Sequence, residues 1–244
     1  MSLQRHTDPL IRNQILTALP REEYERLLAR MTLVQLPRGK RLYYAGQPLR
    51  HAYFLNSGMV SLVSTSQSGS SVEVGMVGDE GCVGAPIILG MPVTPYEVNV
   101  QLEVGSACKI GAEEFQEEFN RGGKLQELML KYIQVMLTQI TQSALCNRFH
   151  TVEERLCRWF LVARDRVNAN TFTLTHESIA QILGTPRTGV TMIAGHLQKE
   201  GIISYSRGRI TILDPKRLQS VACECYEITR ESIGDFTQNR SLVA

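Results

Sequence analysis

The sequence has no apolar run of the roughly 18–20 residues that a membrane-spanning helix needs. Its first residues, Met-Ser-Leu-Gln-Arg-His-Thr-Asp, also lack the apolar core of a secretory signal. With 43% hydrophobic residues, 20% charged residues and a net charge of +2, the 244-residue chain has the composition of a globular protein. We therefore expect a cytoplasmic protein of two domains with no membrane partner.

Catalytic motifs are also missing. The sequence contains no P-loop, no nucleophile elbow and no carboxylate pair that supports catalysis. His51 is the only histidine between Met31 and Phe149, whereas a cupin-like metal enzyme needs several histidines and carboxylates on its strands. We therefore do not expect an enzyme.

The N-terminal part of the chain contains no cysteine before Cys82. In a chain of this length without an export signal, buried free thiols are the usual state. Cys223 and Cys225 stand two residues apart, a spacing too common to imply a metal site, so we expect no metal and no cofactor. The other cysteines are Cys108, Cys146 and Cys157.

Residues 175–201 predict two helices joined by a sharp turn. Thr175 is expected to cap the first helix, and Gly184 supplies the positive φ that the turn needs. Thr185 is expected to cap the second helix, with Pro186 at its first position. The apolar faces of the two helices consist of Ile179, Ala180, Ile182, Leu183, Val190, Ile193, Ala194 and Leu197.

This helix pair has the spacing of a helix-turn-helix, which places its second helix in the major groove of DNA. Arg187, Thr188 and Thr191 then face outward near the start of that helix, where side chains contact base edges. The alternative is an ordinary antiparallel helix pair with no nucleic-acid partner.

A β-hairpin is predicted directly after the helix pair. Residues 202–205 and 209–213 are the two strands, and Ser206-Arg-Gly is the turn, so the whole forms a winged helix. Thr175, Lys199, Arg207 and Arg209 are candidates for phosphate contacts. Six cations against two carboxylates between Pro186 and Arg217 suit DNA, although a solvated charged surface explains them too.

The first half of the chain predicts helices over residues 8–31 and then short strands without a long helix between them. Strands at this spacing indicate a small antiparallel barrel or jelly roll. The strand candidates are residues 33–36, 52–56, 60–65, 72–76, 96–102 and 106–110.

Two motifs in this region resemble a known family. Leu42-Tyr-Tyr-Ala-Gly-Gln-Pro with Tyr53-Phe-Leu-Asn-Ser-Gly-Met-Val-Ser-Leu62, and then Val72-Glu-Val-Gly-Met-Val-Gly-Asp-Glu-Gly81, resemble the cyclic-nucleotide-binding β-roll of the Crp/Fnr transcription regulators. The winged helix resembles the DNA-binding domain of that family, in the same order. The resemblance implies an α+β fold with an N-terminal antiparallel β-roll, a long dimerisation helix and a C-terminal winged helix-turn-helix. It also implies that double-stranded palindromic DNA and RNA polymerase are partners.

We expect the domains to span residues 1–123, 124–149 and 150–244. The middle segment contains no Gly or Pro from Lys124 to Asn147, which predicts one long helix. In the resembled family this helix is the dimer axis; the alternative is a buried helix in a monomer. The coiled-coil seam consists of Leu130, Ile133, Leu137, Ile140 and Ala144, at spacings of three and four residues.

A further helix is expected from residue 151, with Trp159 packing under the winged helix. After the wing, Pro215 is expected to start the last helix, and the polar tail after Ile233 is expected to be loose.

The resemblance does not extend to the nucleotide clamp. In nucleotide-binding members a carboxylate follows a Gly, and an Arg with Ser or Thr follows about ten residues later. No Arg or Lys occurs between Gly81 and Lys109, and a buried phosphate without a cation is costly. The family's glycine–carboxylate pair can be aligned with this chain in two ways. One alignment places it at Gly78-Asp-Glu-Gly81, where Glu80 supplies the carboxylate. The other places it at Gly84-Ala85, where alanine replaces the carboxylate.

We therefore expect a regulator that does not bind cyclic nucleotide in the usual way. A non-standard phosphate contact or another small-molecule effector remains an alternative. The candidate ligand residues are Gly78, Glu80, Gly81 and Tyr96.

Overall fold

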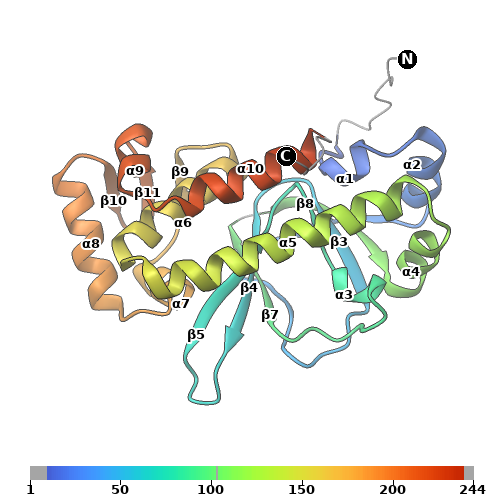
Figure 1. The fold of residues 1–244 in the computed structure, drawn as a ribbon, viewed down its shortest axis with the longest axis horizontal. Coiled ribbons are helices and arrows are strands. Elements are labelled where there is room, and N and C mark those ends of the chain that lie inside the picture. The colour runs from blue at the N-terminus through green and yellow to red at the C-terminus, as the bar shows by residue number, and fades with distance from the viewer. Residues whose placement is uncertain (1–9, 103, 239–244) are drawn as a thin grey trace.

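The computed structural model describes residues 10–102 and 104–238 and arranges them as a β-roll, a long helix and a winged helix (Figure 1). Two short helices, α1 (Gln14–Thr17) and α2 (Arg21–Leu28), precede the roll, as the apolar periodicity predicts. Residues 8 and 9 of that predicted span lie outside the described residues, as do the first and last residues of the two outer predicted domains.

The roll consists of two four-stranded antiparallel sheets, which confirms all six strand candidates. In β7, Val98, Val100 and Leu102 point inward and alternate with half-buried polar residues, the period-2 pattern of a strand with one buried face. The first sheet has the order β1 (Thr32–Leu36), β8 (Val104–Gly111), β3 (His51–Leu55) and β6 (Cys82–Val83); the second has the order β2 (Arg41–Tyr43), β7 (Glu97–Leu102), β4 (Met59–Thr65) and β5 (Ser71–Val77).

Two helices follow strands of the roll and pack against each other. The short helix α3 (Ala85–Ile88) follows β6, and α4 (Ala112–Asn120) follows β8. Phe115 of α4 meets Phe54 of β3 edge to face, with ring centroids 5.5 Å apart. Neither helix was predicted. Helix α3 has only four residues, whereas α4 carries an apolar pair at helical spacing, Phe115 and Phe119, a signal that was present in the sequence and was not used.

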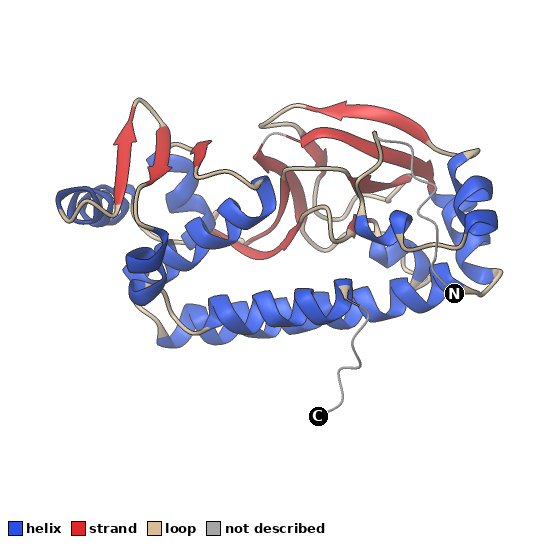
Figure 2. Cartoon of the chain, turned by 90° about the horizontal axis from the view of Figure 1, so that it is seen from above, coloured by secondary structure: helices blue, strands red, loops and turns tan. Residues whose placement is uncertain are grey.

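The predicted long helix is α5 (Lys124–Phe149). It runs along one whole side of the molecule, beneath the strands of both domains (Figure 2). Its first half packs against the roll through Leu128, Met129 and Tyr132, all of which are buried. A single bend at His150 then leads into α6 (Val152–Val167), which begins with a capping box between Thr151 and Glu154.

The second half of the chain is the predicted winged helix. It consists of α7 (His176–Leu183), α8 (Arg187–Lys199), and a three-stranded sheet of order β10 (Ile203–Ser206), β11 (Arg209–Ile212) and β9 (Thr171–Thr173). The predicted helix after Pro215 is α9 (Pro215–Val221), capped by Asp214, but it is not the last one, because α10 (Cys225–Thr237) follows it. The strand β9 was not predicted.

The expectation of a loose tail after Ile233 is wrong for residues 234–237, which are helical, and its last part, residues 239–244, lies outside the described residues. Helix α10 (Cys225–Thr237) packs along α5 and continues past Ile233, and Phe236 is buried with its ring centroid 6.0 Å from that of Tyr132 (Figure 1). One aromatic residue in a polar stretch gives almost no periodic signal, so only its tertiary partner reveals its role.

The two domains share a core around α6. Trp159 is buried, as expected, but its neighbours include Met59, Met76 and Leu102 of the roll as well as residues of the winged helix. The indole Nε1 of Trp159 donates a hydrogen bond of 2.9 Å to Oε1 of Glu73 on β5, and Ser61 Oγ donates to the other oxygen of that carboxylate.

Burial raises the pKa of the Glu73 carboxyl to about 7, although the hydrogen bonds from Ser61 and Trp159 oppose the shift. Folding therefore favours the protonated form of Glu73 at pH values where the unfolded chain ionises it.

From these pKa values we predict that Glu73 contributes a fall of roughly 3 kcal/mol in the free energy of unfolding as pH rises from about 4.5 to about 7, because its carboxyl in the native state holds a proton that the unfolded chain releases. Glu73→Gln should reduce the slope by this amount, since glutamine is neutral at every pH and still accepts a hydrogen bond. Part of the slope should remain, because burial also raises the pKa of Asp79, to about 6. Denaturant titrations across this pH range measure it, with Glu113→Gln on the exposed face of α4 as the matched control. Equal slopes for the wild type and Glu73→Gln would contradict the prediction.

Candidate DNA-binding surface and effector cavity

The turn of the helix-turn-helix has the predicted backbone. Thr175 caps α7, with its Oγ1 accepting the Ser178 N–H at 3.1 Å, and Gly184 has a φ of +59°. The predicted cap of α8 is wrong: Thr185 makes no capping hydrogen bond, and Pro186 occupies the cap position, one residue later. Proline fixes φ at a value that suits this position, so the helix starts at Arg187 without a side-chain cap.

Helix α8 presents the predicted outer face. Val190, Ala194 and Leu197 are buried, whereas Arg187 and Thr188 are exposed. Thr191 is also exposed, but its hydroxyl donates to the Arg187 carbonyl at 3.1 Å and lies 3.0 Å from Nδ1 of His176. A base contact by Thr191 would therefore use its methyl group or require this hydroxyl to turn.

His176 is a residue of this surface that the sequence did not point to. Its ring stacks on Tyr205 of the wing, with centroids 4.1 Å apart and planes 18° apart. Burial and the nearby charge of Arg187 lower the pKa of His176. This residue thus links the first turns of α7 and α8 to the wing, a contact between segments far apart in sequence.

The wing is a two-residue hairpin. Arg207 and Gly208 have φ values of +50° and +78°, and Ser206 pairs with Arg209, as in a type I′ turn. The tip lies beside the start of α7, because the Leu174 N–H donates to the Gly208 carbonyl at 2.7 Å. Arg207, Arg209 and Thr175 are exposed around this point. Lys199 is exposed as well, but it lies at the other end of α8, about three turns from Arg187.

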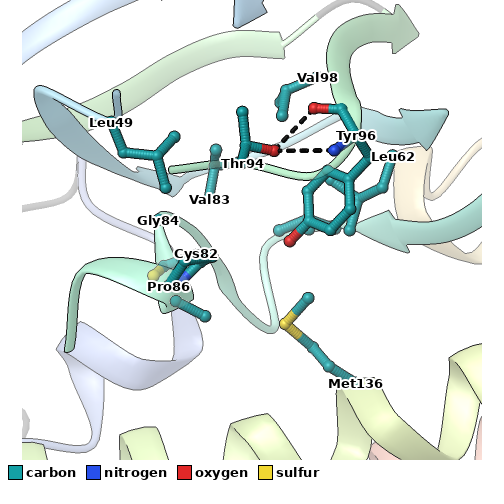
Figure 3. Close-up of a pocket in the computed structure, with 12 residues that line it drawn as sticks. Leu49, Leu62, Cys82, Val83, Gly84, Pro86, Thr94, Tyr96, Val98 and Met136 are labelled. Atoms are coloured by element: carbon teal, nitrogen blue, oxygen red, sulfur yellow. Dashed lines mark hydrogen bonds between the residues drawn. The ribbon is translucent and has the colours of Figure 1, made fainter. Parts of the chain in front are cut away.

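A small cavity opens inside the roll, between β4, β6, α3, β7 and the long helix α5 (Figure 3). Its volume of about 10 Å³ leaves room for about one water molecule. Its polar groups are Cys82, Thr94 and Tyr96, and no charged side chain lines it. Burial raises the pKa of the Tyr96 hydroxyl, and the Thr94 hydroxyl is occupied by a 2.7 Å hydrogen bond to the Tyr96 carbonyl.

Of the four candidate ligand residues, only Tyr96 lines this cavity. Gly78 and Gly81 are needed for close packing: an added Cβ would lie 2.3 Å from the Glu80 carboxylate at Gly78 and 2.2 Å from the Tyr132 ring at Gly81. Glu80 is buried and accepts a hydrogen bond of 2.8 Å from Nη2 of Arg166 on α6. It also accepts the Gly78 N–H at 3.1 Å, so it ties the roll to α6.

The proposed seam lies on the outer side of α5. Leu130 and Leu137 are 52% and 53% exposed, which is unusual for leucine on a helix whose opposite side is buried. Ala144 is exposed, and Ile133 and Ile140 are half-buried beside them. Helix α10 covers a different side of α5, through Phe236 on Tyr132, and leaves this stripe uncovered.

Two family models match most of this architecture. A model of the cyclic nucleotide-binding domain matches residues 33–121, which hold the roll, and a model of the Crp-like helix-turn-helix domain matches residues 154–221, which hold the winged helix. The chain belongs to the Crp/Fnr family of transcription regulators. It is accordingly a Crp/Fnr-type transcription regulator with a helix-turn-helix DNA-binding domain.

Individual relatives are distant in sequence but similar in fold. The chain is 22% identical over 196 residues to the global nitrogen regulator of Synechococcus elongatus, covering 77% of this chain and 88% of that protein. A crp/fnr family regulator from Eubacterium rectale superimposes with a TM-score of 0.65 at 20% identity, covering 83% of this chain and 94% of that one. The c-di-GMP-responsive regulator CLP of Xanthomonas campestris gives 0.63 at 17% identity, covering 79% and 99%. Among the described helices, none is long and apolar enough to cross a membrane.

The cavity favours one of the two registers considered for the Crp/Fnr glycine–carboxylate pair. Gly84, with a φ of +122°, and Ala85 at the start of α3 both line it, whereas Glu80 does not. Ten residues further on, the chain reaches Pro95, between the two cavity residues Thr94 and Tyr96. At both places where the resemblance leads one to expect a charged residue, this chain has an uncharged one.

Because Glu80 and Arg166 are both buried, we predict that Arg166→Met alone lowers the free energy of unfolding by about 3–5 kcal/mol, since it leaves a buried carboxylate without its cation. The double variant Glu80→Gln/Arg166→Met should recover most of this loss. Chemical denaturation measures all three proteins, with Arg164→Met on the same helix, a partly exposed arginine, as the control. Equal losses in the single and double variants would show that the pair is not what stabilises this contact.

Proposed function

We propose that this Crp/Fnr regulator acts as a homodimer on a palindromic operator and does not bind cyclic nucleotide in the way usual for the family. The observation that carries the proposal is the cavity of the roll, which has no cation and room for about one water molecule. A cyclic phosphate placed there would lose its hydration without gaining a charged partner.

An effector of other chemistry fits this cavity better. Its walls are apolar apart from Cys82, Thr94 and Tyr96, so a small neutral molecule is the class it favours, and the walls must separate to admit it. Met136 of α5 forms one wall, which places the long helix against any such ligand (Figure 3). Regulation by the amount of protein alone remains the alternative.

The exposed face of α8 supports a specific operator. We propose that Arg187, Thr188 and Thr191 contact bases, and that Thr175, Lys199, Arg207 and Arg209 contact phosphates. Arg187 suits a bidentate contact to guanine. Met192 is 76% exposed where the best-known family helix has a second Arg, so an apolar contact to a thymine methyl group replaces a charged contact.

Dimerisation follows from the uncovered stripe on α5. Leu130, Leu137 and Ala144 share one side of the helix with Ile133 and Ile140, and two copies packed along this stripe would form a short coiled coil. Such a dimer would present two α8 helices to successive half-sites. We propose domain limits of residues 1–123, 124–149 and 150–244, a cytoplasmic location, and RNA polymerase as a further partner.

The first test is a binding-site selection from random duplex DNA with the full-length protein, without nucleotide and with cyclic AMP or cyclic GMP. We expect enrichment of a palindrome with two half-sites that is the same in all three conditions. Enrichment only in the presence of a nucleotide would overturn the proposal for the roll. A selected site with a single half-site would overturn the proposal for the dimer.

Arg187→Ala should relax specificity at one base pair in each half-site and cost about 1–3 kcal/mol of binding free energy per contact. Arg209→Ala is the matched control, because loss of a phosphate contact weakens binding to all sequences alike and lowers the salt dependence. If Arg187→Ala selects the same sequence as the wild type, α8 does not read the operator through this residue.

Leu137→Lys should convert the dimer to a monomer, because it places a charge in the centre of the stripe in both chains. Loss of two buried leucines weakens association on the order of 100-fold or more. Sedimentation equilibrium measures this, with Thr138→Lys on another side of α5 as the control. An unchanged dimer in Leu137→Lys would mean that the chains associate elsewhere.

A further inference from the structure

The C-terminal end of α5 lies near the start of α10 (Figure 1). Four side chains that can bind a metal come together there: Cys146, His150, Cys223 and Cys225. One ligand atom from each residue lies within 4.8 Å of every other. Cys146 lies in the last turn of α5 and His150 caps the end of that helix. Cys223 lies between α9 and α10, and Cys225 is the first residue of α10. The three cysteines are buried and free.

The spacing fits one tetrahedral ion. Zinc binds sulfur at about 2.3 Å and imidazole nitrogen at about 2.0–2.1 Å, so neighbouring ligand atoms lie roughly 3.5–3.8 Å apart. Here Sγ of Cys146 lies 3.6 Å from Sγ of Cys223, and Sγ of Cys225 lies 3.4 Å from Nδ1 of His150. Four atoms this close can bind one ion together, and three thiols with one imidazole are a donor set typical of zinc.

The surroundings have the outer partners that such a site needs. With Nδ1 of His150 turned to the cysteines, its Nε2 lies 3.2 Å from the Glu224 carboxylate, the histidine–carboxylate contact that orients metal-binding imidazoles. Nε2 of Gln142 donates to Sγ of Cys225 at 3.0 Å. Such a donor stabilises a thiolate, the form of cysteine that binds metal.

Nearby charges also suit a thiolate-rich site. Zn²⁺ with three thiolates and a neutral imidazole carries one net negative charge. Arg155 and Arg158 of α6 are 8% and 7% exposed and interact electrostatically with Cys146. The Nε groups of both arginines are buried without a hydrogen-bond partner. Thiolates that bind a metal would supply the negative charge that compensates these two buried positive charges.

We propose that Cys146, His150, Cys223 and Cys225 form a zinc site that fastens α10 to the junction of α5 and α6. All four residues lie outside the ranges 33–121 and 154–221 that the family models match, so the site belongs to this chain and not to either domain as such. His150 directly precedes Thr151, the cap of α6. The metal therefore holds the bend at which the chain leaves α5 for the DNA-binding domain.

The direct test is the metal content and cobalt spectrum of the full-length, tag-free protein. Purified protein loaded with Zn²⁺ and passed over a weak chelating resin should retain about one zinc per chain by mass spectrometry of the metal. Co²⁺ in its place should give thiolate-to-cobalt charge transfer and the strong visible bands of a tetrahedral site. Retention of less than about 0.1 zinc per chain, or an octahedral cobalt spectrum, would overturn the proposal. So would a Cys146–Cys223 disulfide in the freshly reduced and loaded protein.

Variants locate the site. Cys223→Ser and Cys225→Ser should each weaken zinc binding at least 100-fold, while Cys157→Ser, a buried cysteine of α6 outside the cluster, should retain it. Glu224→Gln should lower affinity about 10–100-fold and keep the tetrahedral cobalt spectrum. Equal zinc retention in Cys223→Ser and the wild type would overturn the assignment.

Hydrogen exchange on the wild type alone gives an independent readout that needs no folded variant. A strong chelator should speed exchange in residues 222–237 and 142–151 and leave the strands of the roll unchanged. Unchanged exchange in α10 after removal of the zinc would overturn the fastening role.

Discussion

The arrangement of this regulator depends on the burial of α6 between the two domains. Ten of its side chains are buried, among them Trp159 and Arg166, and each of these two reaches a carboxylate of the roll. Glu73 and Glu80 are themselves buried, so leaving either without a partner would be costly. This requirement helps to hold the DNA-binding domain at one position on the roll.

Strand β5 lines the cavity of the roll and also makes a contact between the domains. Val77 of β5 lines the cavity, and Glu73, on the same strand, meets Trp159. Met136, which also lines the cavity, lies on α5, and the outer side of α5 carries the exposed Leu130 and Leu137. The cavity, the proposed dimer face and the contact with the DNA-binding domain thus lie on elements that touch one another.

Local signals were reliable where local chemistry decides the structure. The glycine at the helix turn, the Arg207–Gly208 hairpin and the alternating strands of the roll all follow from backbone preferences and periodicity. The cap of α8 was placed one residue early, because Thr185 and Pro186 are both good at starting helices and only the structure separates them. The buried Phe236 in a polar tail gave no local signal.

By itself the sequence determined the order of roll, long helix and winged helix, because periodicity and turn residues are properties of the chain alone. It also determined that no Arg or Lys occurs between Gly81 and Lys109, where the family's phosphate-binding Arg is expected. Tertiary structure decided which carboxylate faces what. Glu80 forms an ion pair with Arg166 and does not line the cavity, whereas Gly84 and Ala85 do line it. It also decided that Cys146 and His150 meet Cys223 and Cys225 across more than 70 residues of sequence. Contacts of this kind depend on how the helices pack against each other, and the spacing of residues along the chain does not reveal how they pack.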